Sequence, residues 1–389
     1  MALVGIIAEF NPLHSGHKLL IDTAKKGGNT VAVVISGNFV QRGDTAIIPK
    51  IKRAEAALIC GADIVVELPV LWSMSTAQNF ALGGVAQLNS LGCEKIIFGS
   101  ECGDIERLKK TADILLSDDF SSLVKEEVKN GVTFASARQK AAIALGADES
   151  LLNSPNDNLG LEYIMAAKAL NLDIDFNCIK RKGAMHDSEQ ISDNLVSSSF
   201  IRGKLKDNDL GYAERFMPIA LRGFIGSDFV SDINRIETAI LAILRQKTIE
   251  DFKNLPDISE GIENKLFFSV RVATSLDELY SMIKSKRYTL ARVRRLVLSA
   301  ALGLTNEFFM TKPPYTRVLG FSKNGEAILK NISADTPVIT KVSAIKELDE
   351  ASQKVFQIEQ RATDLYALSL KAPIECGAEF KYKLLKTEN

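Results

Sequence analysis

Two of the three histidines in this 389-residue chain, His14 and His17, lie in one short segment that reads EFNPLHSGH. The segment follows an apolar strand-like run and precedes a helical pattern. A helix start offers unpaired backbone N–H groups and the positive end of the helix dipole, which together favour an anion. Gly16 has no side chain to hold a phosphate off the backbone, and both imidazoles could donate to phosphate oxygens. The pattern predicts a phosphate-binding site; the alternative is a capping turn whose histidines only pack.

Other polar loops follow later strand-like runs. Segment 36–44 carries Gln41 and Arg42 between glycines, and planar donors of this kind suit a carboxylate or a phosphate. Further candidates for contacts with a base, a ribose or phosphates are Gly99, Asn156, Arg181, Ser199 and Arg202. The alternatives for these loops are plain turns, ordinary helix caps and solvated basic surface.

The ordered set GIIAEFNPLHSGH, SGNFVQRGD, FGSE, SPNDNLGLEYI, RKGAMHD and SSSFIR resembles the bacterial tRNA(Met) cytidine acetate ligase family, which belongs to the HIGH-type nucleotidyltransferases. The resemblance covers nearly the whole chain. It implies a ligase that activates acetate with ATP to acetyl-adenylate, releasing diphosphate. The acetyl group then passes to N4 of the wobble cytidine of elongator tRNA(Met), giving N4-acetylcytidine.

The resemblance also implies which residues contact ATP. These are Ile7, Ala8, Glu9, Phe10, Asn11, Pro12, Leu13, His14, Ser15, Gly16, His17, Lys18, Leu19 and Leu20, with Gly99, Asn156 and Arg181. Because acetate is a weak nucleophile that attacks a charged phosphate, we expect the site to supply donors and orientation more than a strong base.

Individual roles follow as hypotheses. We expect His14 and His17 to be catalytic, and Gln41 or Arg42 to orient the acetate. Arg181, Ser199 and Arg202 are expected to hold the triphosphate. Mg²⁺ is expected to accompany the phosphates, so no dedicated protein metal site is predicted.

Hydrophobic periodicity predicts the elements that position these residues. Strands are expected at 3–9, 30–35, 64–68, 95–98 and 173–179, with amphipathic helices between them. This order predicts an α/β fold with a parallel sheet, and ligands then bind beyond the carboxyl ends of the strands. The resemblance implies that the sheet is Rossmann-like, of the HUP type, with helices on both faces. We expect a catalytic domain at 1–212 with a helical insert at about 118–145, and a mainly helical domain at 213–389.

Charge and composition indicate which kinds of partner to expect. The net charge is zero, but residues 1–210 hold 22 basic and 26 acidic residues, and residues 211–389 hold 26 and 22. A basic run in the second half predicts tRNA contacts, with an ordinary solvated helix face as the alternative. Its members are Lys284, Lys286, Arg287, Arg292, Arg294 and Arg295. Five scattered cysteines and no long apolar run predict a reduced, cytoplasmic protein without a membrane partner.

Two alternatives stay open at this stage. One is a small-molecule adenylyl- or cytidylyltransferase of cofactor metabolism, and the other is an RNA-binding protein without catalysis. The length and the basic second half favour a macromolecular acceptor over the first alternative, and intact His14, Gly16 and His17 disfavour the second. The sequence does not decide the oligomeric state.

Overall fold

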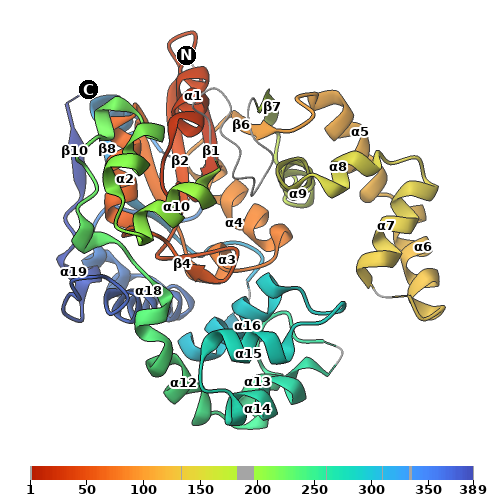
Figure 1. Ribbon diagram of the computed structural model, residues 1–389. Coiled ribbons are helices and arrows are strands. Elements are labelled where there is room, and N and C mark those ends of the chain that lie inside the picture. The colour runs from red at the N-terminus through yellow and green to blue at the C-terminus, as the bar shows by residue number, and fades with distance from the viewer. Residues whose placement is uncertain are drawn as a thin grey trace.

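A computed structural model describes residues 2–132, 134–181, 197–259, 261–308, 310–332 and 335–388. Its centre is an eight-stranded, mostly parallel sheet (Figure 1). The strand order is β10 (Leu385–Thr387), β8 (Thr316–Ser322), β5 (Ile64–Leu68), β2 (Thr30–Ser36), β1 (Leu3–Ala8), β6 (Lys95–Ser100) and β7 (Asp175–Lys180), with β9 (Val338–Ile339) beside β8. Among the described strands of this sheet, β5 and β8 form the one antiparallel pair.

Helices cover both faces of the sheet, as predicted. The helices α1 (Ser15–Ala24), α2 (Lys50–Ile59) and α10 (Ser198–Lys206) share one apolar core, and α3 (Val70–Ser73), α4 (Ala77–Ser90) and α9 (Pro155–Ala169) share the other. Strand β1 alternates between them, because Val4 and Ile6 face the first core while Leu3 and Ile7 face the second. This period of two is what a strand buried on both sides requires.

The connection from β6 to β7 is helical in its described residues and includes the predicted insert. It contains α5 (Ile105–Leu115), α6 (Asp118–Lys129), α7 (Phe134–Ala144) and α8 (Glu149–Asn153) before α9. Figure 1 shows α5 to α8 projecting from one side of the sheet. The predicted range of 118–145 corresponds to α6 and α7.

The second half of the chain forms a helical cluster at the bottom of Figure 1. Its members are α12 (Glu237–Arg245), α13 (Ile249–Lys253), α14 (Ile262–Val272), α15 (Leu276–Ile283) and α16 (Leu290–Leu302). The short α11 (Leu210–Ala213) and the 3₁₀ turns η1 (Glu214–Phe216), η2 (Ile219–Leu221), η3 (Ser227–Phe229), η4 (Ile233–Ile236), η5 (Asn306–Phe308) and η6 (Val342–Glu347) connect the larger elements.

The end of the chain differs from the expected helical domain at 213–389. Strands β8 and β10 lie in the central sheet, together with α17 (Lys323–Leu329), α18 (Glu350–Ala367) and α19 (Ala378–Lys381) around it. Strand β8 is buried along its whole length. A short apolar run predicts a buried strand but not the sheet that it joins. The sequence pattern therefore did not predict that the end of the chain returns to the central sheet.

The sheet creates a crevice at one end. Strand β2 lies on one side of β1 and β6 on the other, so the loops that follow β1 and β6 diverge. Ligands of open α/β sheets bind at such a switch point, outside the carboxyl ends of the strands. A small hairpin, β3 (Phe39–Val40) with β4 (Asp44–Thr45), follows β2 at the same end. Among the described residues, no helix combines the length and apolar character needed to cross a membrane.

Candidate active site

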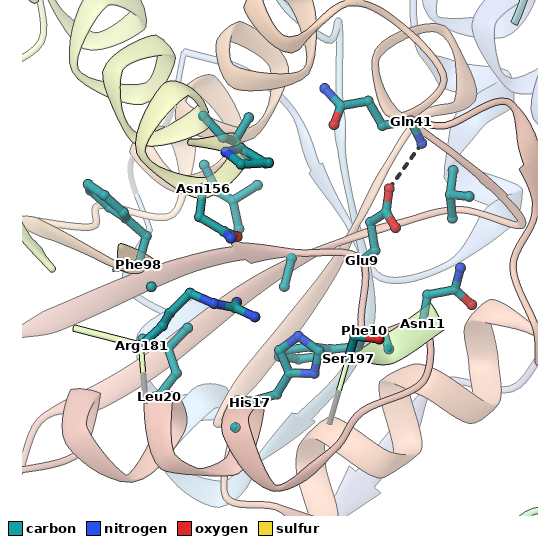
Figure 2. A pocket seen from close by; sticks show the side chains of 18 of the residues that line it. Glu9, Phe10, Asn11, His17, Leu20, Gln41, Phe98, Asn156, Arg181 and Ser197 are labelled. Carbon is teal, nitrogen blue, oxygen red and sulfur yellow. Dashed lines mark hydrogen bonds between the residues drawn. The ribbon is translucent and has the colours of Figure 1, made fainter. Parts of the chain in front are cut away.

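A cavity of about 620 Å³ opens at this crevice. Most of the residues predicted to contact nucleotide or acetate line it: Ile7, Ala8, Glu9, Phe10, Asn11, His14, Gly16, His17, Leu19, Leu20, Gln41, Arg42, Gly99, Asn156, Arg181, Ser199 and Arg202. Figure 2 shows Glu9, His17, Asn156 and Arg181 around one space. Four residues of the expected ATP segment, Pro12, Leu13, Ser15 and Lys18, are absent from its wall.

Three of these four residues have other contacts. Leu13 is buried in the core, and the Ser15 hydroxyl donates to the Phe216 carbonyl at 3.0 Å. Lys18 pairs with Asp22 one turn along the exposed face of α1. Leu13 and Ser15 therefore support the segment from behind, and the expected ATP contacts of all four residues stay predictions.

The two histidines cap the helix that they begin. His14 is the N-cap of α1, and its Nδ1 accepts the Gly16 N–H at 3.0 Å. His17 Nδ1 accepts the His14 N–H at 3.3 Å, which completes a reciprocal capping box. Since Nδ1 of each ring is an acceptor, a neutral ring carries its proton on Nε2. The rings therefore cap the helix, as in a capping turn. Each ring still offers one N–H donor, as a phosphate site requires.

The rings are packed tightly. They stack with centroids 3.9 Å apart, and Phe10 lies 5.0 Å from His17. A Cβ on Gly16 would come within 3.0 Å of the His14 ring, so the glycine makes room for the stacked pair. Phe10 has a φ of 46° and precedes the cis peptide Asn11–Pro12.

Both histidines are neutral at physiological pH. Burial lowers the pKa of His14 to about 3, and the positive charges of Arg181 and Arg202 lower it further. Burial also lowers the pKa of His17 well below its usual value, with His14 and Arg181 contributing. The positive charge of the site therefore resides on arginines, and the histidines supply uncharged hydrogen-bond donors.

Two arginines hold defined positions beside the histidines. Arg181 follows β7 and lies next to Gly99, where an added Cβ would be 3.5 Å from its Cγ. Arg202 donates to the Asn11 carbonyl at 2.9 Å and to Ser199 Oγ at 2.8 Å. Ser197 provides the ordinary serine cap of α10 by accepting the Phe200 N–H. The two helix starts and β7 thus converge on one cationic region.

The loop after β6 and the start of α9 are locked together by carboxylates. Glu101 accepts the side-chain N–H of Asn156 and the backbone N–H of Asp157, the latter at 2.9 Å. Asp157 in turn accepts from Ser100 Oγ and from the backbone N–H of Glu101 and Cys102. Ser154 is the N-cap residue of α9. This network fixes Asn156 in the cavity wall.

The loop after β2 is tied to the loop after β1. Glu9 Oε1 accepts the Gln41 N–H at 3.0 Å, as Figure 2 shows. Arg53, fully buried on α2, donates to carbonyls at the ends of β1 and β2, namely those of Glu9 (2.7 Å), Ser36 (2.9 Å) and Gly37. It also donates to the Ile48 carbonyl (3.1 Å), just before α2. One guanidinium thus positions the backbones that carry His14 and Gln41.

A buried ion cluster lies beneath that second loop. It consists of Lys50, Glu67, Arg317, Glu359 and Glu379, from α2, β5, β8, α18 and α19. A Cβ on Gly37 would be 3.0 Å from Glu67 Oε1 and 3.3 Å from Glu359 Oε2. Asn38 connects the loop to the same region, because it accepts the Lys50 N–H at 2.9 Å and donates to Thr363 at 3.0 Å.

The cluster balances its charges by protonation. Burial and the nearby Glu67 raise the pKa of Glu359 well above its usual range. Burial also acts on Glu379, but Lys50 and Arg317 outweigh it and lower that pKa to about 2. With Glu359 neutral, two cations face two carboxylates, which is the arrangement that a buried network requires.

The predicted tRNA-binding run divides into three groups. Lys284, Lys286 and Arg287 are exposed between α15 and α16. Arg292 donates to the Asp257 carbonyl and to Ser259, and Arg295 to Asp257 and the Gln41 carbonyl, so both hold α16 in place. Arg294 lines the cavity.

Several cavity residues were not singled out from the sequence. They are Val40, Asp44, Ala77, Phe80, Phe98, Pro155, Asn158, Leu159, Tyr163, Ile179, Lys180, Ser197 and Ser198. Some of these belong to the recognised motifs, such as Phe98 in FGSE and Tyr163 in the SPN segment. Ala77 and Phe80 lie on α4, and a helical pattern does not indicate which of its residues face a ligand.

Residues 182–196, which include His186 and most of the RKGAMHD motif, lie outside the described residues. Within the described ranges, no group of three His, Cys, Asp or Glu side chains could hold a metal ion. An ion that accompanies ATP would be held largely through phosphate oxygens, which is usual for Mg²⁺.

Comparisons with known proteins agree with this geometry. Residues 1–378 match a family model described as HIGH Nucleotidyl Transferase. A relative from Caldanaerobacter subterraneus named tRNA(Met) cytidine acetate ligase is 38% identical over 99% of this chain and 100% of its own length, and one from Clostridium perfringens is 35% identical over 94% and 95%. A crystal structure of Thermotoga maritima TmcAL bound with alpha-thio ATP has a TM-score of 0.90 and 29% identity, covering both chains fully. The chain therefore belongs to the tRNA(Met) cytidine acetate ligase family of HIGH nucleotidyl transferases.

Proposed function

We propose that this protein is an ATP-dependent ligase that attaches acetate to N4 of the wobble cytidine of elongator tRNA(Met). The observation that carries the proposal is the cavity itself. It joins the histidine-capped helix start, Arg181, Arg202 and Asn156 in a chain that aligns over its length with relatives of that name. Its volume of about 620 Å³ is within the range of pockets that hold small ligands.

The first step forms acetyl-adenylate. A carboxylate oxygen of acetate attacks the α-phosphorus of ATP, and the bond from that phosphorus to the bridging oxygen breaks. Diphosphate leaves with the electron pair. Negative charge grows on the α-phosphate oxygens, where the Nε2–H groups of His14 and His17 donate, while Arg181 and Arg202 neutralise the phosphates. Mg²⁺, when bound to the phosphates, supplies additional charge neutralisation.

The second step transfers the acetyl group. N4 of cytidine attacks the acyl carbon, the bond from that carbon to the AMP oxygen breaks, and N4 loses a proton. AMP leaves with the electron pair. Orientation of two bound reactants is the main contribution expected from a site without a strong base.

We assign the tRNA contact of the helical cluster to Lys284, Lys286 and Arg287. Arg292 and Arg295 bind neighbouring protein groups and Arg294 faces the cavity, so these three exposed cations remain for phosphates. Replacing all three with alanine should weaken tRNA binding. The slope of log K for tRNA against log salt concentration should become shallower by up to about 3. Filter binding at several salt concentrations measures the affinity and the slope. An unchanged slope would show that these three residues do not bind tRNA phosphates.

Incubation with ATP, labelled acetate and total tRNA tests the activity. We expect label in one tRNA as N4-acetylcytidine, with AMP and diphosphate as products. Label in a nucleotide-linked metabolite would favour the small-molecule transferase, and bound but unmodified tRNA would favour a binding protein. The cytoplasmic location expected from the sequence stays a prediction.

A further inference from the structure

The helical cluster contributes a side chain to the catalytic cavity. The N-terminal half of α16 packs directly on the turn between β3 and β4. Gly43 has a φ of 70°, and a Cβ there would lie 2.5 Å from the Arg295 backbone nitrogen and 2.7 Å from Arg294 Cβ. Arg295 fixes this contact by donating to the Gln41 carbonyl at 3.3 Å. The Arg294 side chain consequently lines the same cavity as Gln41 and Arg42.

The Arg294 guanidinium is oriented by an aromatic ring. It lies 5.4 Å from the centroid of the Tyr280 ring, a geometry that holds an arginine plane without removing its charge. No described residue forms a hydrogen bond or an ion pair with this guanidinium. A half-buried cation aimed into a cavity under these conditions is suited to an anionic ligand.

The positions of Arg181, Arg202 and Arg294 indicate which anion Arg294 would bind. The proposed reaction brings together two anions, ATP and a carboxylate, and the histidines are neutral. Arg181 lies beside Gly99, and Arg202 is bonded to the Asn11 carbonyl, so both stand next to the loops after β6 and β1. Arg294 comes instead from α16 and lies beside the turn between β3 and β4. In-line displacement at the α-phosphorus requires the nucleophile to approach from the side opposite the departing diphosphate.

We propose that Arg294 binds the carboxylate of acetate and holds it for attack on the α-phosphorus. The inference rests on the proposed function. The acetate oxygen forms its bond to phosphorus while the bond to the bridging oxygen breaks, and diphosphate takes the electron pair. Val40 and Phe80 line the same cavity and provide an apolar surface for the methyl group.

Arg294→Gln and Arg294→Lys test the assignment without tRNA. The readouts are acetate-dependent formation of AMP or acetyl-adenylate from ATP, and the Kd of ATP alone by calorimetry. We expect Arg294→Gln to raise the KM for acetate by about 10- to 100-fold, the effect of losing one charge-assisted hydrogen bond. The Kd of ATP should change by less than about twofold, and Arg294→Lys should recover part of the loss.

Arg222→Gln is a matched control, because Arg222 is exposed and does not line the cavity. An unchanged KM for acetate in Arg294→Gln would overturn the proposal. So would an equal loss of ATP affinity, which would assign Arg294 to the nucleotide, or a defect seen only when tRNA is added, which would assign it to tRNA. If the wild-type protein consumes ATP without any dependence on acetate, the proposed function itself fails, and this inference with it.

Discussion

Replacing Lys50 with methionine should destabilise the protein by about 3–5 kcal/mol. The Lys50 ammonium is fully buried and contacts Glu67 and Glu379, with Glu359 at 3.9 Å. Without it, two buried carboxylates share only Arg317. Breaking a buried pair costs this much because the remaining charge keeps its desolvation penalty. Folded domains have only about 5–15 kcal/mol of stability, so the effect is large.

A double variant checks the charge argument. In Lys50→Met with Glu379→Gln, Arg317 faces Glu67 alone, so the charges balance again. We expect this variant to be more stable than the sum of the single changes by at least about 1 kcal/mol. Lys52→Met on the same helix is the control, since Lys52 is partly exposed and its ion pair with Glu55 contributes about 0–1 kcal/mol.

Urea unfolding followed by Trp72 fluorescence measures the free energies of the wild type, Lys50→Met, Glu379→Gln, the double variant and Lys52→Met. Trp72 is the single tryptophan and is buried on α3. Because Gly37 and Asn38 contact the cluster, Lys50→Met should also raise the KM for acetate through the loop that carries Gln41. A loss below about 1 kcal/mol in Lys50→Met, or strict additivity in the double variant, would refute the reasoning.

Two further predictions concern the cavity. Because burial lowers the pKa of His14 to about 3 and that of His17 well below 6.5, the unfolded chain binds more protons below pH 6.5, and the free energy of unfolding should fall as the pH falls towards 3. The urea midpoint should change more between pH 7.5 and pH 5 for the wild type than for the double variant His14→Gln, His17→Gln. Equal changes would contradict the lowered pKa values of the two histidines. Asp157→Asn should weaken ATP binding by about tenfold and stability by about 1–3 kcal/mol, because Asp157 accepts bonds from Ser100, Glu101 and Cys102. Calorimetry with ATP measures the first effect, and an unchanged Kd would show that the network is not needed to place Asn156.

Local patterns predicted the catalytic half well. The strands β1, β2, β5 and β6 are mostly apolar runs, so hydrophobic periodicity located them. Strand β7 reads DFNCIK and is half exposed, and its predicted range of 173–179 begins two residues before the strand does. The expected strand at 64–68 coincides with β5. The placement of the motifs after strands then followed from the parallel topology.

What the sequence could not show depends on long-range packing. Arg294 stands in a basic run that resembles a surface, and nothing local indicates that α16 rests on Gly43. The five members of the buried cluster come from elements as far apart as α2 and α19. The sequence does not indicate whether a charged residue is buried. The position of Arg294 and the buried cluster are therefore seen only in the structure.

The capping geometry changes how the HxGH motif is expected to act. A bare helix start would offer its backbone N–H groups to phosphate, but the Gly16 and His14 N–H groups are already bonded to the two Nδ1 atoms. The rings therefore stand between the helix end and the ligand, and each has an acceptor on one edge and a donor on the other. His14→Asn separates these roles, because asparagine is a strong N-cap but lacks a ring that extends a donor into the cavity.

We expect His14→Asn to change the urea midpoint little, with a loss below about 1 kcal/mol, while kcat for adenylate formation falls by about 100-fold or more, as for removal of one transition-state donor. His14→Ala should lose both stability and rate. If His14→Asn kept wild-type kcat, the ring donor would not act on the transition state, and the backbone at the helix start would have to bind the phosphate directly. A parallel loss of stability and rate in His14→Asn would instead make the histidine a structural cap.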